Sequence, residues 1–222
     1  MDNRRLKFKD YKAIAFLYGI VYTTIPIIIL EILWDNLANL IGLSGLIREL
    51  IASFFRAALI EEFFKLYGFI KADKEYKFIN EREYMLAAGT IGLTYGIIEK
   101  IATGNAIAII LGIIFPMHLL WQLNQGRHFY AYFKAKEIGD KKKAKHEFFM
   151  ATFLVFLIHG CWDAILSIIE YSFDDKAATW LNSLGGILFI LLIAFGIFYI
   201  IISYKRTKKV LSNSKEDLQK LE

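Results

Sequence analysis

The residues with the clearest capacity for chemistry are two glutamates and a lysine inside an otherwise apolar stretch. Residues 51–70 read IASFFRAALIEEFFKLYGFI, long enough for a membrane-embedded helix, and they contain Glu61, Glu62 and Lys65. An ionisable side chain at the centre of a bilayer costs about 2.5–3.5 kcal/mol on insertion scales. Such side chains therefore face the interior of a helix bundle or a water-filled cavity, which makes these three residues a candidate functional site.

The spacing of the three residues allows two separate acid roles on one helix. Lys65 follows Glu61 by four residues and Glu62 by three, so it is a helical neighbour of both. We expect Lys65 to neutralise one carboxylate and keep it ionised, while the other points elsewhere and acts as a general base. A structural ion-pair triad that locks helices together explains the motif equally well.

A second candidate acid lies in the next apolar segment. Glu99 ends the run GLTYGIIE, and Tyr95 lies one helical turn before it on the same face. Gly92 and Gly96 in this run form a small-residue pair that permits close approach of another helix. Read alone, Glu99 is near enough to the outer end of its helix to be a snorkelling side chain.

Two histidines lie in the later apolar segments. His118 occurs within FPMHLLWQLNQG, and His159 precedes Asp163 by one helical turn. A carboxylate in that position can orient the imidazole ring and select its tautomer. Interhelical hydrogen bonds account for each histidine singly. Jointly, these side chains predict a buried Glu/His cluster that activates water, through a general base or through a metal bound by histidine and carboxylate.

The composition independently predicts an integral membrane protein. The 222 residues are 56% hydrophobic with a mean hydropathy of +0.42, whereas soluble domains are roughly 45–50% apolar. No linker-like segment divides the chain, so we predict one membrane domain over 1–222, with cytoplasmic tails at 1–12 and 205–222. The single cysteine, Cys161, excludes an intrachain disulfide framework.

Apolar segments of bilayer-spanning length predict an all-α, polytopic transmembrane helix bundle of about six spans. These segments fall near 13–34, 40–70, 84–102, 106–126, 147–169 and 179–203. The second segment is longer than one crossing requires. We therefore expect a seventh or interfacial helix within 37–55.

The basic residues are distributed very unevenly between the loops. All but five of the 27 Lys and Arg residues lie in 1–12, 71–83, 127–146 and 205–222, whereas the opposite loops hold only Lys176. By the positive-inside rule, both termini are cytoplasmic in a multi-pass protein of the cell membrane. This placement favours contact with the lipid bilayer and its anionic head groups over nucleic-acid binding.

The polar residues, in this order, resemble the motifs of the PrsW family of intramembrane proteases, which is related to the CAAX prenyl-proteases and bacteriocin-processing membrane enzymes. The similar stretches are E-E-x-x-K at Glu61, Glu62 and Lys65, F-x-x-x-E at Tyr95 and Glu99, a histidine followed by a glycine at His118 and Gly126, and H-x-x-x-D/N at His159 and Asp163. There are two departures from the family pattern. Tyr95 replaces the usual Phe, and Lys100 stands where Asn is frequent.

The resemblance implies hydrolysis of a peptide bond in a membrane-bound protein substrate, such as a single-span anti-sigma factor cut on its extracytoplasmic side. It implies that Glu61 is the general base. It further implies that Glu62 and Lys65 set the charge around Glu61. His118 and Glu99 would help to hold the water or the tetrahedral intermediate. His159 with Asp163 would stabilise the oxyanion.

Three alternatives stay open at the level of sequence. We expect a glutamic mechanism without a cofactor, but two histidines and a glutamate can also form a catalytic zinc site, here without H-E-x-x-H spacing. A proton- or ion-coupled carrier would use the same Glu/His cluster as a relay. A non-catalytic membrane scaffold would use it only to join helices.

Overall fold

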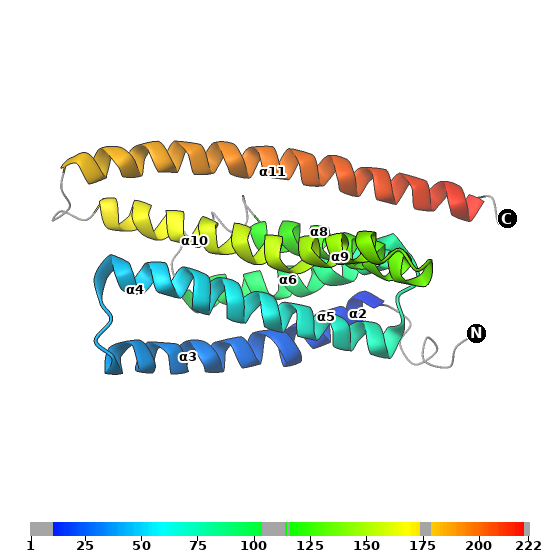
Figure 1. Ribbon diagram of the computed structural model, residues 1–222, viewed down its shortest axis with the longest axis horizontal. Helices are drawn as coiled ribbons and strands as arrows, with labels where there is room; N and C mark the ends of the chain where they lie inside the picture. Colours follow the sequence, from blue (N-terminus) through cyan, green and yellow to red (C-terminus); the bar gives the residue numbers. More distant parts are fainter. Residues whose placement is uncertain (1–10, 104–113, 115, 174–178, 220–222) are drawn as a thin grey trace.

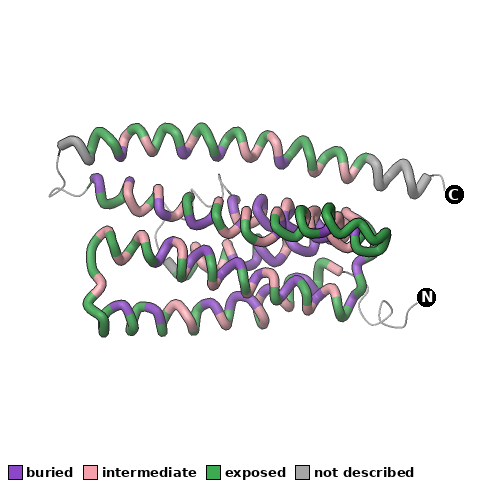
Figure 2. The backbone as a smooth tube through the Cα atoms, viewed as in Figure 1, coloured by how far each residue is buried: buried purple, intermediate pink, exposed green. Residues whose placement is uncertain are grey.

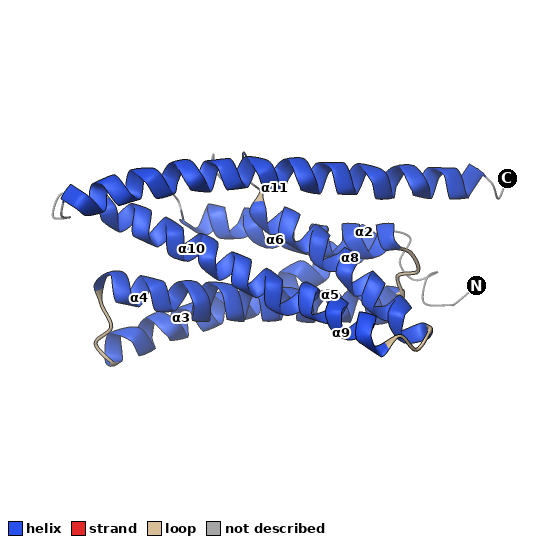
Figure 3. Ribbon diagram, turned by 45° about the horizontal axis from the view of Figure 1, so that its top comes forward, coloured by secondary structure: helices blue, strands red, loops and turns tan. Residues whose placement is uncertain are grey.

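The computed structural model describes residues 11–103, 114, 116–173 and 179–219, with residues 103, 179–181 and 213–219 described in their backbone alone. All its elements in these ranges are helical (Figure 1, Figure 3), which confirms the all-α prediction. The predicted tail 1–12, the first half of the predicted span 106–126 and Lys176 lie wholly or mainly outside these ranges.

The helices follow in the order α2 (Tyr11–Tyr18), η1 (Gly19–Thr24), α3 (Ile25–Leu40), α4 (Gly45–Ala52), η2 (Ser53–Glu61), α5 (Glu62–Tyr76), α6 (Glu81–Thr103), α8 (Met117–Glu137), α9 (Lys141–Phe149), η3 (Met150–Leu154), α10 (Val155–Ser172) and α11 (Thr179–Gln219). The three η segments are π-helical and continue directly into the α-helices beside them. Helix α11 packs along α10 and α8 at the edge of the bundle (Figure 1, Figure 3).

The protein is a polytopic helical membrane protein. Four helices within the described residues are long and apolar enough to cross a bilayer, at Tyr11–Leu40, Glu81–Ala102, Lys141–Ser172 and Asn182–Ser212. They coincide with four of the six predicted segments. The other two segments correspond to the charged helical run that ends at Tyr76 and to α8, which extends to Glu137.

Within 37–55, where a further helix was expected, the structure has α4 (Gly45–Ala52), which continues directly into η2. Residues 37–40 complete α3, residues 41–44 turn the chain, and one continuous helical run begins at Gly45. Gly42 and Gly45 have φ of 72° and 60°, a left-handed conformation that costs glycine little. The Leu43 amide donates to the Ala38 carbonyl at 2.9 Å and closes the turn. The excess length of the apolar segment is thus used to end one helix and start the next.

The distribution of polar and apolar side chains is that of a protein in lipid. Large apolar side chains such as Leu33, Ile190 and Phe198 are more than half exposed, and most of the described surface of α11 is exposed (Figure 2). In water, apolar faces of this extent would drive association. The charged Glu61 and Lys65 are instead buried, because ionisable groups in a membrane helix face the protein interior.

Helices α6 and α8 approach closely because glycines line their contact. A Cβ on Gly92 would lie under 3.0 Å from the His118 carbonyl oxygen, and one on Gly96 would lie 3.1 Å from the His118 ring. A Cβ on Gly126 of α8 would lie 2.9 Å from the Met85 Cα of α6. The small-residue face predicted at Gly92 and Gly96 is therefore confirmed, and it sets the position of His118.

Candidate active site

The charged triad lies where a π-helical segment meets a regular α-helix. η2 ends at Glu61 and α5 begins at Glu62. π-Helical turns shift the register of the side chains that follow and occur frequently at functional sites. On the neighbouring first helix, the Thr23 hydroxyl donates to the Phe64 carbonyl at 3.1 Å. As a result, Glu61, Glu62 and Lys65 all face the bundle interior, with exposures of 3%, 5% and 0%.

The Lys65 ammonium contacts three partners rather than one. Its Nζ lies 3.0 Å from Glu61 Oε2, 2.9 Å from Glu62 Oε1 and 3.0 Å from His118 Nδ1. These contacts use all three donors of an ammonium. The expectation that Lys65 neutralises one carboxylate while the other points elsewhere is therefore wrong, because both carboxylates converge on the same Nζ.

The two glutamates differ in a way that does not depend on Lys65. Glu62 also contacts His159 Nδ1 at 2.8 Å through Oε1, and its Oε2 accepts from Gln122 Nε2 at 2.7 Å. Glu61 lies 3.9 Å from His159 Nε2, which is beyond hydrogen-bond distance. Glu62 is thus held by three groups, while Glu61 keeps acceptor capacity for another partner.

His118 is the second residue of α8 and joins the triad to Glu99. Its Nε2 lies 3.0 Å from Glu99 Oε2, and Glu99 Oε1 accepts from Lys100 at 3.1 Å. Because the Lys65 ammonium can only donate, His118 Nδ1 must accept and the ring proton lies on Nε2. Glu99 therefore orients the His118 ring and fixes its tautomer.

His159 lies between carboxylates on both sides of its ring. Its Nδ1 faces Glu62, and its Nε2 lies 3.2 Å from Asp163 Oδ2, which confirms the predicted one-turn pair. Both nitrogens face acceptors, so this arrangement suits a ring with two N–H donors. Trp121 covers the ring with 4.6 Å between the ring centroids. His159 is 1% exposed.

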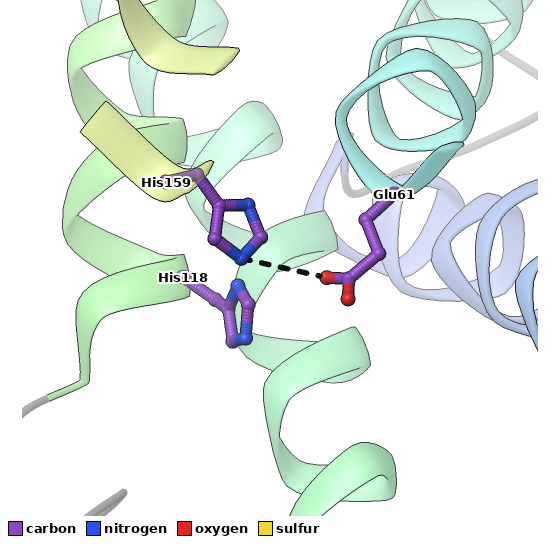
Figure 4. A group of neighbouring side chains, drawn as sticks. All are labelled: Glu61, His118 and His159. Atoms are coloured by element: carbon purple, nitrogen blue, oxygen red, sulfur yellow. Dashed lines mark ion pairs between the residues drawn. The ribbon is translucent and has the colours of Figure 1, made fainter. Parts of the chain in front are cut away.

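The structure brings all the predicted site residues into one connected cluster. In Figure 4, the rings of His118 from α8 and His159 from α10 lie together and face the Glu61 carboxylate. One ligand atom from each of these three residues lies within 4.8 Å of the others. Glu99 and Asp163 lie at the margin, each about one quarter exposed. Tyr95 is buried above the Lys65 ammonium, 4.4 Å from Nζ to the ring centroid.

Two buried residues of the cluster were not predicted as site residues. Gln122 is 0% exposed and supplies the neutral hydrogen bond to Glu62. Its position one turn after His118, as an amide in an apolar stretch, was a usable signal. Trp121 packs against the rings of both His118 and His159. No sequence signal distinguished this tryptophan from an ordinary apolar residue.

Glu61, His118 and His159 also form a donor set suited to a divalent metal ion. Two histidines and one carboxylate with an open position are a known catalytic zinc set. The second ring nitrogen of each histidine contacts a carboxylate, Glu99 or Glu62, as in many zinc sites. The donors fit once His159 Nε2 gives up its proton, because that nitrogen otherwise faces Asp163. The Lys65 ammonium contacts both Glu61 and His118, so a metal ion would compete with it for these two ligands.

Residues 9–201 match the model of a protein family described as the PrsW family of intramembrane metalloproteases. The matched region is most of the chain and includes every residue of the cluster. Neither the curated proteins nor the solved structures contain a match.

Proposed function

Because the chain belongs to the PrsW family of intramembrane metalloproteases, we propose that its buried cluster hydrolyses a peptide bond of a membrane protein with water activated by Glu61. The observation that carries this proposal is the convergence of Glu61 with His118 and His159 from two other helices. A carboxylate that retains acceptor capacity beside two imidazoles is suited to general base catalysis.

Each residue takes a role that follows from its contacts. Glu61 accepts the proton of the attacking water, and the same proton later passes to the leaving amine. Glu62 is held by Lys65, His159 and Gln122, so it positions these groups rather than reacting. The His159 N–H beside Asp163 donates to the oxygen that becomes negative in the tetrahedral intermediate.

His118 and Glu99 hold the opposite side of the site. Glu99 fixes the orientation of the His118 ring, which places the imidazole to hold the water or the tetrahedral intermediate. A divalent metal held by Glu61, His118 and His159 would supply Lewis-acid polarisation of the substrate carbonyl. In either case, Glu99 sets the tautomer of His118, and Glu62 orients the His159 ring.

We place six spans in the membrane, with both termini in the cytoplasm. One end of the bundle holds the start of α2, the α5–α6 connection, the α8–α9 turn and the end of α11 (Figure 1). These are the regions with most basic residues.

Glu99 lies near the end of α6 and His118 at the start of α8. Both are therefore toward the opposite, extracytoplasmic end, which supports cleavage on that side. A single-span substrate such as an anti-sigma factor is proposed from the family resemblance alone.

Cleavage of co-expressed single-span proteins tests the proposal. Glu61→Gln should abolish cleavage, because the amide cannot accept the proton of water. Glu49→Gln makes the same change at an exposed glutamate of α4, and it should cleave as the wild type does. Equal cleavage by both variants would refute the role of Glu61.

Chelation of the purified protein distinguishes a metal-free glutamic mechanism from a metal-dependent one. A glutamic enzyme remains active after chelation and contains no stoichiometric metal. A metal-dependent enzyme loses its bound metal and its activity together, and both return when the metal is restored. Elemental analysis before and after chelation therefore decides whether the donor set of Glu61, His118 and His159 holds an ion.

A further inference from the structure

Arg56 carries a guanidinium within the apolar helical run that leads to the charged triad. Its Nη1 lies 3.8 Å from Glu31 Oε1 of α3, which is an ion pair but beyond hydrogen-bond distance. Its Nε is buried and has no hydrogen-bond partner among the described residues. Charged side chains inside a membrane bundle usually pair closely with other polar groups. The loose pairing of Arg56 therefore requires an explanation.

Arg48, nearer the extracytoplasmic start of the same helical run, has the close pairing that Arg56 lacks. Its Nη2 donates to Asp35 Oδ1 at 3.0 Å, and its Nη1 donates to Asn39 Oδ1 at 2.9 Å. Both arginines face carboxylates of α3, and their side chains are similarly exposed, at 26% for Arg48 and 32% for Arg56. Exposure therefore does not explain why only one guanidinium is held by hydrogen bonds.

Arg56 lies on the extracytoplasmic side of the general base. One π-helical turn, in which each residue bonds the fifth along the chain, separates it from Glu61 in η2. Its partner Glu31 is within electrostatic reach of Lys65 and Glu99. Arg56 and Glu31 are each between one quarter and one third exposed, as Glu99 is at the margin of the cluster. A peptide segment that reaches Glu61 from the extracytoplasmic side would therefore meet the Arg56 guanidinium.

We propose that Arg56 determines substrate specificity by binding a carboxylate side chain of the substrate on the extracytoplasmic side of the cleaved bond. This role rests on the proposed peptidase function. The planar edge of a guanidinium donates two parallel hydrogen bonds to a carboxylate, and Nε belongs to such an edge. The helical rise from Arg56 to Glu61 is about 7 Å, which an extended chain covers in about two residues. The preferred acidic residue therefore lies within about three residues of the cleaved bond.

A single-span reporter protein that the wild type cleaves tests this specificity. Mass spectrometry of the products locates the cleaved bond, and Asp or Asn is then placed in turn at each nearby position on its extracytoplasmic side. We expect the wild type to cleave the best Asp reporter with a kcat/KM about 10–100-fold above that of its Asn counterpart, as for hydrogen bonds to a charged group. Because both reporters meet the same enzyme preparation, this Asp-to-Asn ratio does not depend on the folded fraction.

Three variants separate the charge of Arg56 from its geometry and its position. Arg56→Gln should abolish or invert the Asp-to-Asn ratio, because Glu31 then repels the substrate carboxylate. Arg56→Lys keeps the charge without the planar edge, so its ratio should lie between those of Arg56→Gln and the wild type. Arg48→Gln removes an arginine whose hydrogen bonds stay within the protein, and its ratio should equal that of the wild type.

Three results would overturn the role of Arg56. One is a wild-type ratio below about threefold at every position, and another is an equal change of the ratio in Arg56→Gln and Arg48→Gln. The third is a wild-type ratio in Arg56→Lys, which decides the question even if Arg56→Gln does not fold. In each case, cleavage that is lost in Glu61→Gln would leave the proposed function intact. If Glu61→Gln cleaves the reporters normally, the proposed function fails and the role of Arg56 fails with it.

Discussion

Replacing Gly92 with alanine should displace α8 from α6 and disable the site without altering any candidate catalytic side chain. The new Cβ would lie under 3.0 Å from the His118 carbonyl oxygen and 2.8 Å from Gln122 Cβ, whereas ordinary contact begins at 3.4 Å. Both neighbours belong to α8, and a backbone oxygen cannot rotate away. The helices must therefore separate by more than about half an ångström.

The displacement acts on the site through the residues that α8 carries. The 3.0 Å contact between Lys65 and His118 and the 2.7 Å bond from Gln122 to Glu62 both cross from α8 to the charged triad. A misplacement of about 1 Å at an active site can cost about 10²-fold in rate. Overpacking in a well-packed core costs about 1–3 kcal/mol. We expect losses of about 10-fold or more in kcat/KM and of about 1–3 kcal/mol in stability.

The assay combines substrate cleavage with thermal unfolding in detergent. Gly186→Ala on α11 is the matched control, because a Cβ there meets nothing within 4 Å. It should leave activity unchanged and stabilise α11 slightly, since alanine favours helix more than glycine does. If Gly92→Ala has the same activity and unfolding temperature as Gly186→Ala, then α6 and α8 do not approach as closely as described. Gly92 would then have no role in positioning His118.

Further predictions follow from the contacts around the triad. Gln122→Leu leaves Glu62 Oε2 without its 2.7 Å donor. It should reduce the free energy of unfolding, measured by chemical denaturation, by about 1.5–3 kcal/mol. Unchanged stability would show that Glu62 does not need this hydrogen bond. Lys65→Met removes the ammonium shared by two buried carboxylates and should cost about 3–5 kcal/mol without metal. Because Lys65 also contacts His118, the same variant should retain more zinc than the wild type through gel filtration, and equal retention would contradict competition between ammonium and metal.

Much of the fold could be predicted because membrane helices depend on local composition. The apolar segments near 13–34, 84–102, 147–169 and 179–203 correspond to helices of spanning length, since an apolar run satisfies its own backbone hydrogen bonds in lipid. The segment 40–70 was harder to assign. Its length alone did not reveal that the chain would turn at Gly42 and Gly45 and continue as one helical run.

The membership of the site was also largely predictable. Glu61, Glu62, His118 and His159 are costly in an apolar helix, so each had to find a partner inside the bundle. The spacing of His159 and Asp163 predicted their contact, because a one-turn neighbour lies on the same helix face in any fold.

The helical membrane architecture, the ionisable residues that must turn inward and the pairs that meet along one helix all follow from the order of the amino acids. The contacts of Lys65 with both glutamates and His118, and of Gln122 with Glu62, depend on how the helices pack. The physical reason is that spacing within a helix follows from helical geometry, whereas contacts between helices depend on their crossing and axial offset. Those are set by the packing of side chains distant in sequence, as at Gly92, where the absence of a Cβ lets α8 bring His118 to the triad.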